Sequence, residues 1–217
     1  AHISPTMKYL AHWIYSSPGL EGGVTEHRLV DKATDYLCSW RFENREEAVG
    51  AAREFIEFCQ GRAWVFTDTG VEKDGERLYQ FTHRTFLEYF TAAHLVRTHP
   101  TPDILAAILV PRIIRGEWDV VGQLAFQLQH KNVEGAADQL LSTLLTTAHD
   151  SAKAEEAWSL ESFAARSLEF LVPRPRMARE IAMACLRRCL AWGEARREDR
   201  ARPGDRVVGR GRRTQRH

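Results

Sequence analysis

The sequence predicts a mainly α-helical protein: a winged-helix-like unit with a small β-hairpin, followed by an α-helical bundle or the start of an α-solenoid. Three observations lead to this fold class. Apolar residues recur at helical spacing through most of the 217 residues. In residues 62–82, two short β-like runs flank a polar turn instead. From residue 101 onward, every apolar pattern is helical again.

We expect residues 1–24 to form the end of a preceding helical subdomain and a linker. Met7, Leu10 and Ile14 fall on one side of a helix. The stretch SSPGLEGG then interrupts that helix, because it is rich in Ser, Pro and Gly. Residue 1 is not a methionine, so we also expect the chain to begin inside a larger polypeptide.

A winged-helix-like domain is predicted for residues 25–97, and two helices open it. Thr25 is suited to cap the first helix. Asn44, followed by Glu47 three residues later, resembles a capping box at the start of the second, which Gly61 ends. The apolar positions expected to face the core are Leu29, Ala33, Leu37, Trp40, Ala48, Ala52, Phe55 and Cys59.

A β-hairpin and a third helix complete this domain. RAWVFTD and LYQFT have the composition of strands, and Asp74-Gly75 between them is typical of a tight turn. The third helix follows Thr82 and ends at His99-Pro100, because the residue before a proline disfavours helix. Its expected buried face is Phe86, Tyr89, Phe90 and Ala93, and its expected exposed face includes Glu88 and Thr91.

Residues 101–193 are predicted to form an all-helical domain. The expected helices are 102–115, 117–130, 133–149, 155–171 and 175–193, with breaks near Pro111, Gly116, Lys131-Asn132, His149-Asp150 and Pro173. Trp118 and Trp158 lie 40 residues apart, near the period of HEAT-like repeats, but their flanking residues differ. A bundle and the start of a solenoid therefore both remain open.

The composition is that of an ordinary soluble globular protein, with 44% hydrophobic and 27% charged residues. The longest apolar run, residues 104–110, is far shorter than the roughly 20 residues that a membrane span needs. No signal peptide is evident, and the four cysteines form no C-x-x-C pair. We therefore expect a cytoplasmic protein with reduced cysteines, no metal site and no membrane partner.

The charge is unevenly distributed along the chain. Residues 194–217 carry nine arginines and four acidic residues, a net charge of +5, whereas the rest of the chain is net acidic. This segment has too few apolar groups to offset the entropy cost of ordering it. It is predicted to be a disordered Arg-rich tail that contacts nucleic acid only non-specifically, through phosphates.

His83 is the candidate functional residue, at the junction between the second strand and the third helix. The ordinary role of a histidine beside an apolar helix face is structural, through a hydrogen bond to a carbonyl group. Its position adds a second interpretation, because a helix N-terminus presents unpaired N–H groups and a partial positive charge that favour phosphate. Helical geometry places His83 on the side of Phe86, so we expect both to point toward whatever this helix packs on.

The stretch LYQFTHRTFLEYFTAAHLV resembles the winged-helix motif of NACHT-type STAND NTPases, a family that includes animal NLR receptors and many bacterial defence or signalling proteins. The family pattern is roughly F-x-H-x-[ST]-F-x-E-[YF]-x-A-A. The matching residues are Phe81, His83, Thr85, Phe86, Glu88, Tyr89, Ala92 and Ala93. The resemblance covers residues 25–97 well and residues 1–24 loosely.

The resemblance implies that His83 contacts the β-phosphate of bound ADP and holds the molecule in a closed state, with Phe86, Tyr89 and Phe90 packing to fix its helix. However, the chain contains no G-x-x-x-x-G-K-[ST] motif and no strand ending in paired acids. The resemblance therefore implies a non-catalytic, regulatory fragment without a cofactor of its own. ADP or ATP with magnesium would bind the nucleotide-binding core of the parent protein, and homo-oligomerisation would accompany activation.

Two other functions are considered. A DNA-binding winged helix needs a basic recognition helix and a basic wing, but helix 45–60 is rich in glutamate and the wing EKDGER is of mixed charge. An independent enzyme would need a recognisable catalytic arrangement, and neither a G-x-S-x-G nor an H-E-x-x-H motif is present. The regulatory fragment is the preferred hypothesis, and the DNA-binding regulator is the alternative.

Overall fold

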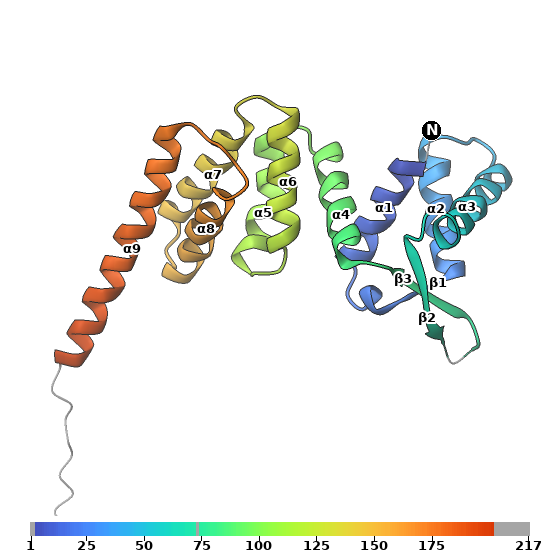
Figure 1. Ribbon diagram of the computed structural model, residues 1–217, viewed down its shortest axis with the longest axis horizontal. Helices are drawn as coiled ribbons and strands as arrows, with labels where there is room; N and C mark the ends of the chain where they lie inside the picture. The colour runs from blue at the N-terminus through green and yellow to red at the C-terminus, as the bar shows by residue number, and fades with distance from the viewer. Residues whose placement is uncertain (1–2, 73, 202–217) are drawn as a thin grey trace, which may run out of the picture.

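The computed structural model describes residues 3–72 and 74–201. It confirms the predicted fold class, because the described chain is mainly helical with one small antiparallel sheet. The helices stand side by side in an elongated row, with α2 and α3 at one end and α9 at the other (Figure 1). Two hydrophobic clusters fill this row, one around the sheet and one along the later helices.

The sheet-containing part of the chain has the element order of a winged helix, and we call it the winged-helix-like unit. Its elements are α1 (Ile3–Ser16), the short 3-10 helix η1 (Leu20–Gly22), β1 (Val24–Thr25), α2 (Glu26–Trp40), α3 (Arg45–Gln60), β2 (Phe66–Val71) and β3 (Arg77–Phe81). The strands lie in the order β1-β3-β2 and are all antiparallel, with Val24 opposite Tyr79 and Phe66 opposite Phe81. The predicted hairpin is thus β2–β3, and a short strand that the sequence did not reveal completes the sheet.

Side-chain caps fix the starts of α2 and α3. The hydroxyl of Thr25 accepts a hydrogen bond from the backbone N–H of Arg28, and the side chain of Asn44 accepts one from the N–H of Glu46. All the predicted core positions of these helices are buried except Trp40, which is 70% exposed. Trp40 is the last residue of α2, and the chain turns directly after it so that Phe42 packs against the core instead.

Helix α1 belongs to the core of the winged-helix-like unit. Met7, Leu10 and Ile14 are buried as predicted, and they share one cluster with residues of α2, α3 and the sheet. Residues 3–24 therefore do not form the separate subdomain end and linker that the sequence indicated. The predicted boundary at residue 25 falls inside a single hydrophobic core.

The remaining helices are α4 (Arg84–Thr98), α5 (Pro102–Ile114), α6 (Asp119–Asn132), α7 (Ala136–Asp150), α8 (Ala154–Ser167) and α9 (Pro175–Ala201). Helix α4 packs on α1 on one side and α6 on the other, and α5 packs on α7. Helix α9 packs on α7 and α8 and so extends the row without returning to close a bundle. This arrangement favours the start of a solenoid, and we refer to α5–α9 as the helical stack.

Two predicted boundaries differ from the structure. Helix α5 continues through Pro111, so this proline does not break it. Helix α9 continues to Ala201, whereas the sequence led us to expect a disordered tail from residue 194. Alanine, arginine and glutamate favour helix even without an apolar face to bury, and these residues dominate the end of α9. The rest of the predicted tail, residues 202–217, lies outside the described residues.

Among the described helices, none combines the length and the apolar character that a membrane crossing requires.

Candidate functional site

The β-hairpin fixes the position of His83. Thr82, the residue before it, donates its hydroxyl to the carbonyl oxygen of Trp64 at 2.8 Å and its backbone N–H to that of Val65 at 2.8 Å. His83 is the N-cap of α4, and its carbonyl oxygen accepts a hydrogen bond from the N–H of Phe86 at 3.0 Å. The start of α4 is therefore held against the chain that leads into β2.

The side chain of His83 is exposed, so it does not point into the rest of this chain. As predicted, it shares a face with Phe86: the two rings meet edge to face, with centroids 5.4 Å apart. That face was expected to be packed, but Phe86 is 41% and Tyr89 43% exposed, while Phe90 is half-buried and Ala93 buried.

Helix α4 buries a different face from the predicted one. Leu87, Glu88, Thr91, Ala92 and Leu95 are buried, and they lie on the side that contacts α1 and α6. The prediction was wrong because it counted Glu88 and Thr91 as polar and therefore outward. Phe86 and Tyr89 accordingly do not fix the helix within this chain.

Glu88 is buried because it is paired. Its carboxylate accepts a hydrogen bond from Nε of Arg84 at 2.9 Å, and the same guanidinium donates to Glu21 of η1 at 3.0 Å. Arg84 also lies over the ring of Tyr15, at 5.9 Å from its centroid. Burial, followed by the nearby Glu88 carboxylate, raises the pKa of Tyr15 above its ordinary value. Arg84 thus links the first turn of α4 to the end of α1. This link fixes the rotation of α4, so that the side carrying Phe86 and Tyr89 faces away from the rest of the chain.

Three exposed aromatic residues belong to segments next to His83: Phe86, whose ring meets that of His83, Tyr89 further along α4, and Trp64, whose carbonyl oxygen binds Thr82. We call these three residues, together with His83, the aromatic face. Trp64 is 76% exposed and has a positive φ of 49°, a backbone conformation that costs a non-glycine residue roughly 1 kcal/mol or more. The hydrogen bonds of Thr82 hold this strained residue next to His83.

The aromatic face has the chemistry to meet an anionic group. Arg84 and Thr85 are the first two residues of α4, so no carbonyl group of the helix can accept their backbone N–H groups. These N–H groups are therefore open to a phosphate oxygen, as at any helix N-terminus. His83 can add one donor beside them. Within residues 3–72 and 74–201, no three His, Cys, Asp or Glu side chains gather in a way that could hold a metal ion.

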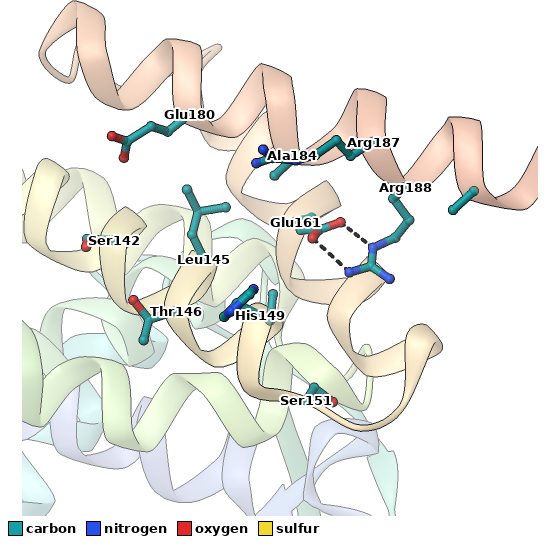
Figure 2. Close-up of a pocket in the computed structure, with 12 residues that line it drawn as sticks. Ser142, Leu145, Thr146, His149, Ser151, Glu161, Glu180, Ala184, Arg187 and Arg188 are labelled. Atoms are coloured by element: carbon teal, nitrogen blue, oxygen red, sulfur yellow. Dashed lines mark hydrogen bonds and ion pairs between the residues drawn. The ribbon is translucent and has the colours of Figure 1, made fainter.

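A groove of about 750 Å³ lies between α7 and α9 and is open to solvent. Figure 2 shows its floor, where Glu161 of α8 meets Arg188 of α9 in two hydrogen bonds of 2.5 and 2.9 Å. Sequence analysis missed this pair because its members lie 27 residues apart on different helices. Thr146 and His149 also line the groove.

Comparison of the chain with protein-family models, with curated proteins and with solved structures gives no match. A functional assignment therefore depends on the residues and the geometry described above.

Proposed function

We propose that this chain is the regulatory, non-catalytic part of a NACHT-type STAND NTPase, in which the winged-helix-like unit holds an ADP-bound closed state. The observation that carries the proposal is the position of His83, exposed at the start of α4 and flanked by exposed aromatic rings. The parent protein would be cytoplasmic, would act in signalling or bacterial defence, and would bind ATP or ADP with magnesium in its own nucleotide-binding core.

The aromatic face supports this proposal because its members Phe86 and Tyr89 are exposed on a helix that otherwise packs on α1 and α6. Contiguous exposed apolar groups commonly mark an interaction site. The nucleotide-binding core would cover Phe86, Tyr89 and Trp64 and bring a phosphate within reach of His83. A charge-assisted hydrogen bond from His83 would then contribute roughly 1.5 to 3 kcal/mol.

Such a contact acts as a switch only if ADP binds the closed state better than the open one. In the closed state, His83 and the core hold the nucleotide together. In the open state, the winged-helix-like unit has moved away and ADP has lost one of its contacts. Opening would also expose the aromatic face, and homo-oligomerisation of the activated protein would follow from that exposure.

The experiment uses the parent protein, with the nucleotide-binding core and this chain in one polypeptide. The protein is purified natively, and the dissociation constant and the amount of co-purified ADP are measured. We expect His83→Ala to weaken ADP retention by about ten- to a hundred-fold. His27→Ala is the matched control, because His27 is an exposed histidine on α2 whose partner is Asp31.

Equal ADP retention in the wild type and in His83→Ala would contradict the role of His83.

Calorimetric titration of ADP into the chain alone gives a second test. We expect no binding there, because a phosphate-cradling loop is absent from the sequence. Tight ADP binding by the chain alone would contradict the regulatory role.

The alternative, a DNA-binding winged helix, has little support from the exposed surface. Helix α3 occupies the position of the recognition helix, and its exposed charged residues are Arg45, Glu46, Glu47, Arg53, Glu54 and Glu57. Four carboxylates against two guanidinium groups repel phosphate. Most of the arginines of the predicted tail lie outside the described residues, so that route to non-specific nucleic-acid binding stays a prediction.

A further inference from the structure

Two histidines stack where the winged-helix-like unit meets the following helices. His12 lies on α1 and His94 on α4, and their rings are nearly parallel, with centroids 4.7 Å apart and an interplanar angle of 26°. Helices α1 and α4 pack closely along their lengths, as Figure 1 shows. The stack therefore lies inside the interface through which α4 connects one hydrophobic cluster to the other.

Aromatic rings surround this pair. The ring of Tyr9 meets His94 edge-on at 6.0 Å, and the ring of Trp118 meets His12 edge-on at 6.2 Å. The Nδ1 atom of His94 is buried and has no hydrogen-bond partner among the described residues. A proton added at this nitrogen would therefore have no acceptor among the described residues.

The charged groups that face the pair are mostly positive. The cations are Lys8 of α1, Arg97 of α4 and Arg112 of α5, and the imidazole of His99, directly after α4, is a further titratable neighbour. Arg112 is itself paired with the carboxylate of Glu117 at 2.8 Å, which also accepts a hydrogen bond from Arg115 at 2.7 Å. From α2, Tyr36 accepts a hydrogen bond from Arg97, and Lys32 lies over the ring of Tyr9.

Both histidines are consequently held in the neutral form. Burial, and then the neighbouring His12, lowers the pKa of His94 from 6.5 to about 4. Burial, and then His99, lowers the pKa of His12. In a state where α1 and α4 have separated, both rings would be hydrated and would regain their ordinary proton affinity.

We propose that the His12–His94 stack is an acid-sensitive latch that joins α1 to α4. Neutral rings stack and keep the interface closed. A proton on either ring places a further cation beside Lys8, Arg97 and Arg112, and the interface opens to hydrate it. This inference does not depend on the proposed function.

The direction of the pH effect follows from the lowered pKa values. Below about pH 6.5, the separated state binds more protons than the closed state, so stability falls as the pH falls. The latch is fully closed above pH 6.5, and it weakens progressively from there down to the pKa of His94 in the closed state, about 4. Salt should weaken the repulsion among these groups only partly, because the pair is half-buried.

Hydrogen–deuterium exchange of the full chain at about pH 7.5 and about pH 5.5 tests the latch across the range in which histidine titrates. After correction for the intrinsic pH dependence of exchange, we expect protection in α1 and α4 to fall tenfold or more at the lower pH. Protection in α7 and α8 should change much less. His94→Phe and His12→Phe each keep a stacked ring that cannot be protonated, so each should weaken the acid response, and the double variant should abolish it. His27→Gln, which removes an exposed histidine, should retain it.

An unchanged acid response in both phenylalanine variants would overturn the proposal. A readout that needs no substitution is the titration of the imidazole resonances of the wild type by NMR. A pKa near 6.5 for both His12 and His94 in the folded protein would overturn the proposal even if neither variant folds. A pKa well below 6.5 for His94, together with loss of protection in α1 and α4 as it titrates, is the result we expect.

Discussion

Glu161 and Arg188 show how much one buried pair contributes to the attachment of α9. The side chain of Glu161 is only 8% exposed, and its carboxylate accepts two hydrogen bonds from the guanidinium of Arg188, whose side chain is 21% exposed. A bidentate pair of this kind is geometrically specific. Removing the arginine would leave a buried carboxylate without its counter-charge, which is costlier than losing an exposed ion pair.

We therefore expect Arg188→Met to lower the free energy of unfolding by about 2 to 3 kcal/mol, less than the loss of a fully buried partner because Arg188 keeps some contact with water. Urea unfolding followed by tryptophan fluorescence measures this, since Trp192 of α9 packs against Trp158 of α8 at 5.0 Å. The control is Glu180→Gln, whose partner Arg176 is exposed, and it should change the free energy by less than about 0.5 kcal/mol. Equal losses in the two variants would show that burial of Glu161 is not what matters.

Single residues also show where sequence patterns are reliable. Leu29, Ala33 and Leu37 are buried as predicted, because helical spacing of apolar residues reports the core face directly. Glu88 is the counter-example: its burial depends on Arg84, and a pattern that scores each residue alone cannot include a partner. The position of His83 at the start of α4 was predictable from the strand–helix junction. Its exposure depends on which face of α4 packs, and this was not predictable.

At the scale of elements, the caps of α2 and α3 were predictable because they are local. Asn44 accepts the N–H of Glu46 at 2.8 Å, which satisfies one of the unpaired donors at the start of α3. We expect Asn44→Ala to cost about 1 kcal/mol of stability, as thermal or urea unfolding would show. Asn44→Asp is the matched control and should be nearly neutral, because it keeps the acceptor. A full loss of stability in the aspartate variant would mean that the cap is not the source of the effect.

The ends of other elements were harder to predict, because they depend on contacts between residues that are far apart in the sequence. β1 has only two residues, and it exists because Val24 and Thr25 pair with Tyr79 and Leu78, more than fifty positions away. No local pattern encodes such a pairing. Helix α9 likewise continues past the point where its apolar periodicity ends, because helix propensity alone sustains it.

At the scale of the whole molecule, α4 is the element that joins two cores. Leu87 belongs to the cluster around the sheet, whereas Ala92, Leu95 and Val96 belong to the cluster of the helical stack. The sequence left a bundle and a solenoid open because both have the same helical periodicity. The difference lies in which helices meet, and contacts such as α5 on α7 and α7 on α9 leave no trace in a single sequence.

This arrangement makes a prediction about cooperativity. In a row of helices, each element is stabilised mainly by its neighbours, so damage at one end should spread only as far as shared contacts allow. Leu141 of α7 is fully buried in the helical stack, and Leu37 of α2 is fully buried in the winged-helix-like unit. Leu→Ala at either position should cost about 2 to 5 kcal/mol locally through the cavity that it leaves.

Native-state hydrogen exchange of the two variants locates the damage. We expect Leu141→Ala to reduce protection across α5–α9 while α2 and α3 stay protected, and Leu37→Ala to do the reverse. Helix α4 should lose protection in both variants, because it contributes residues to both clusters. If either substitution lowered protection equally from α2 to α9, the chain would unfold as one cooperative unit. The interface between α1 and α4 would then transmit stability across the molecule as strongly as either core does within itself.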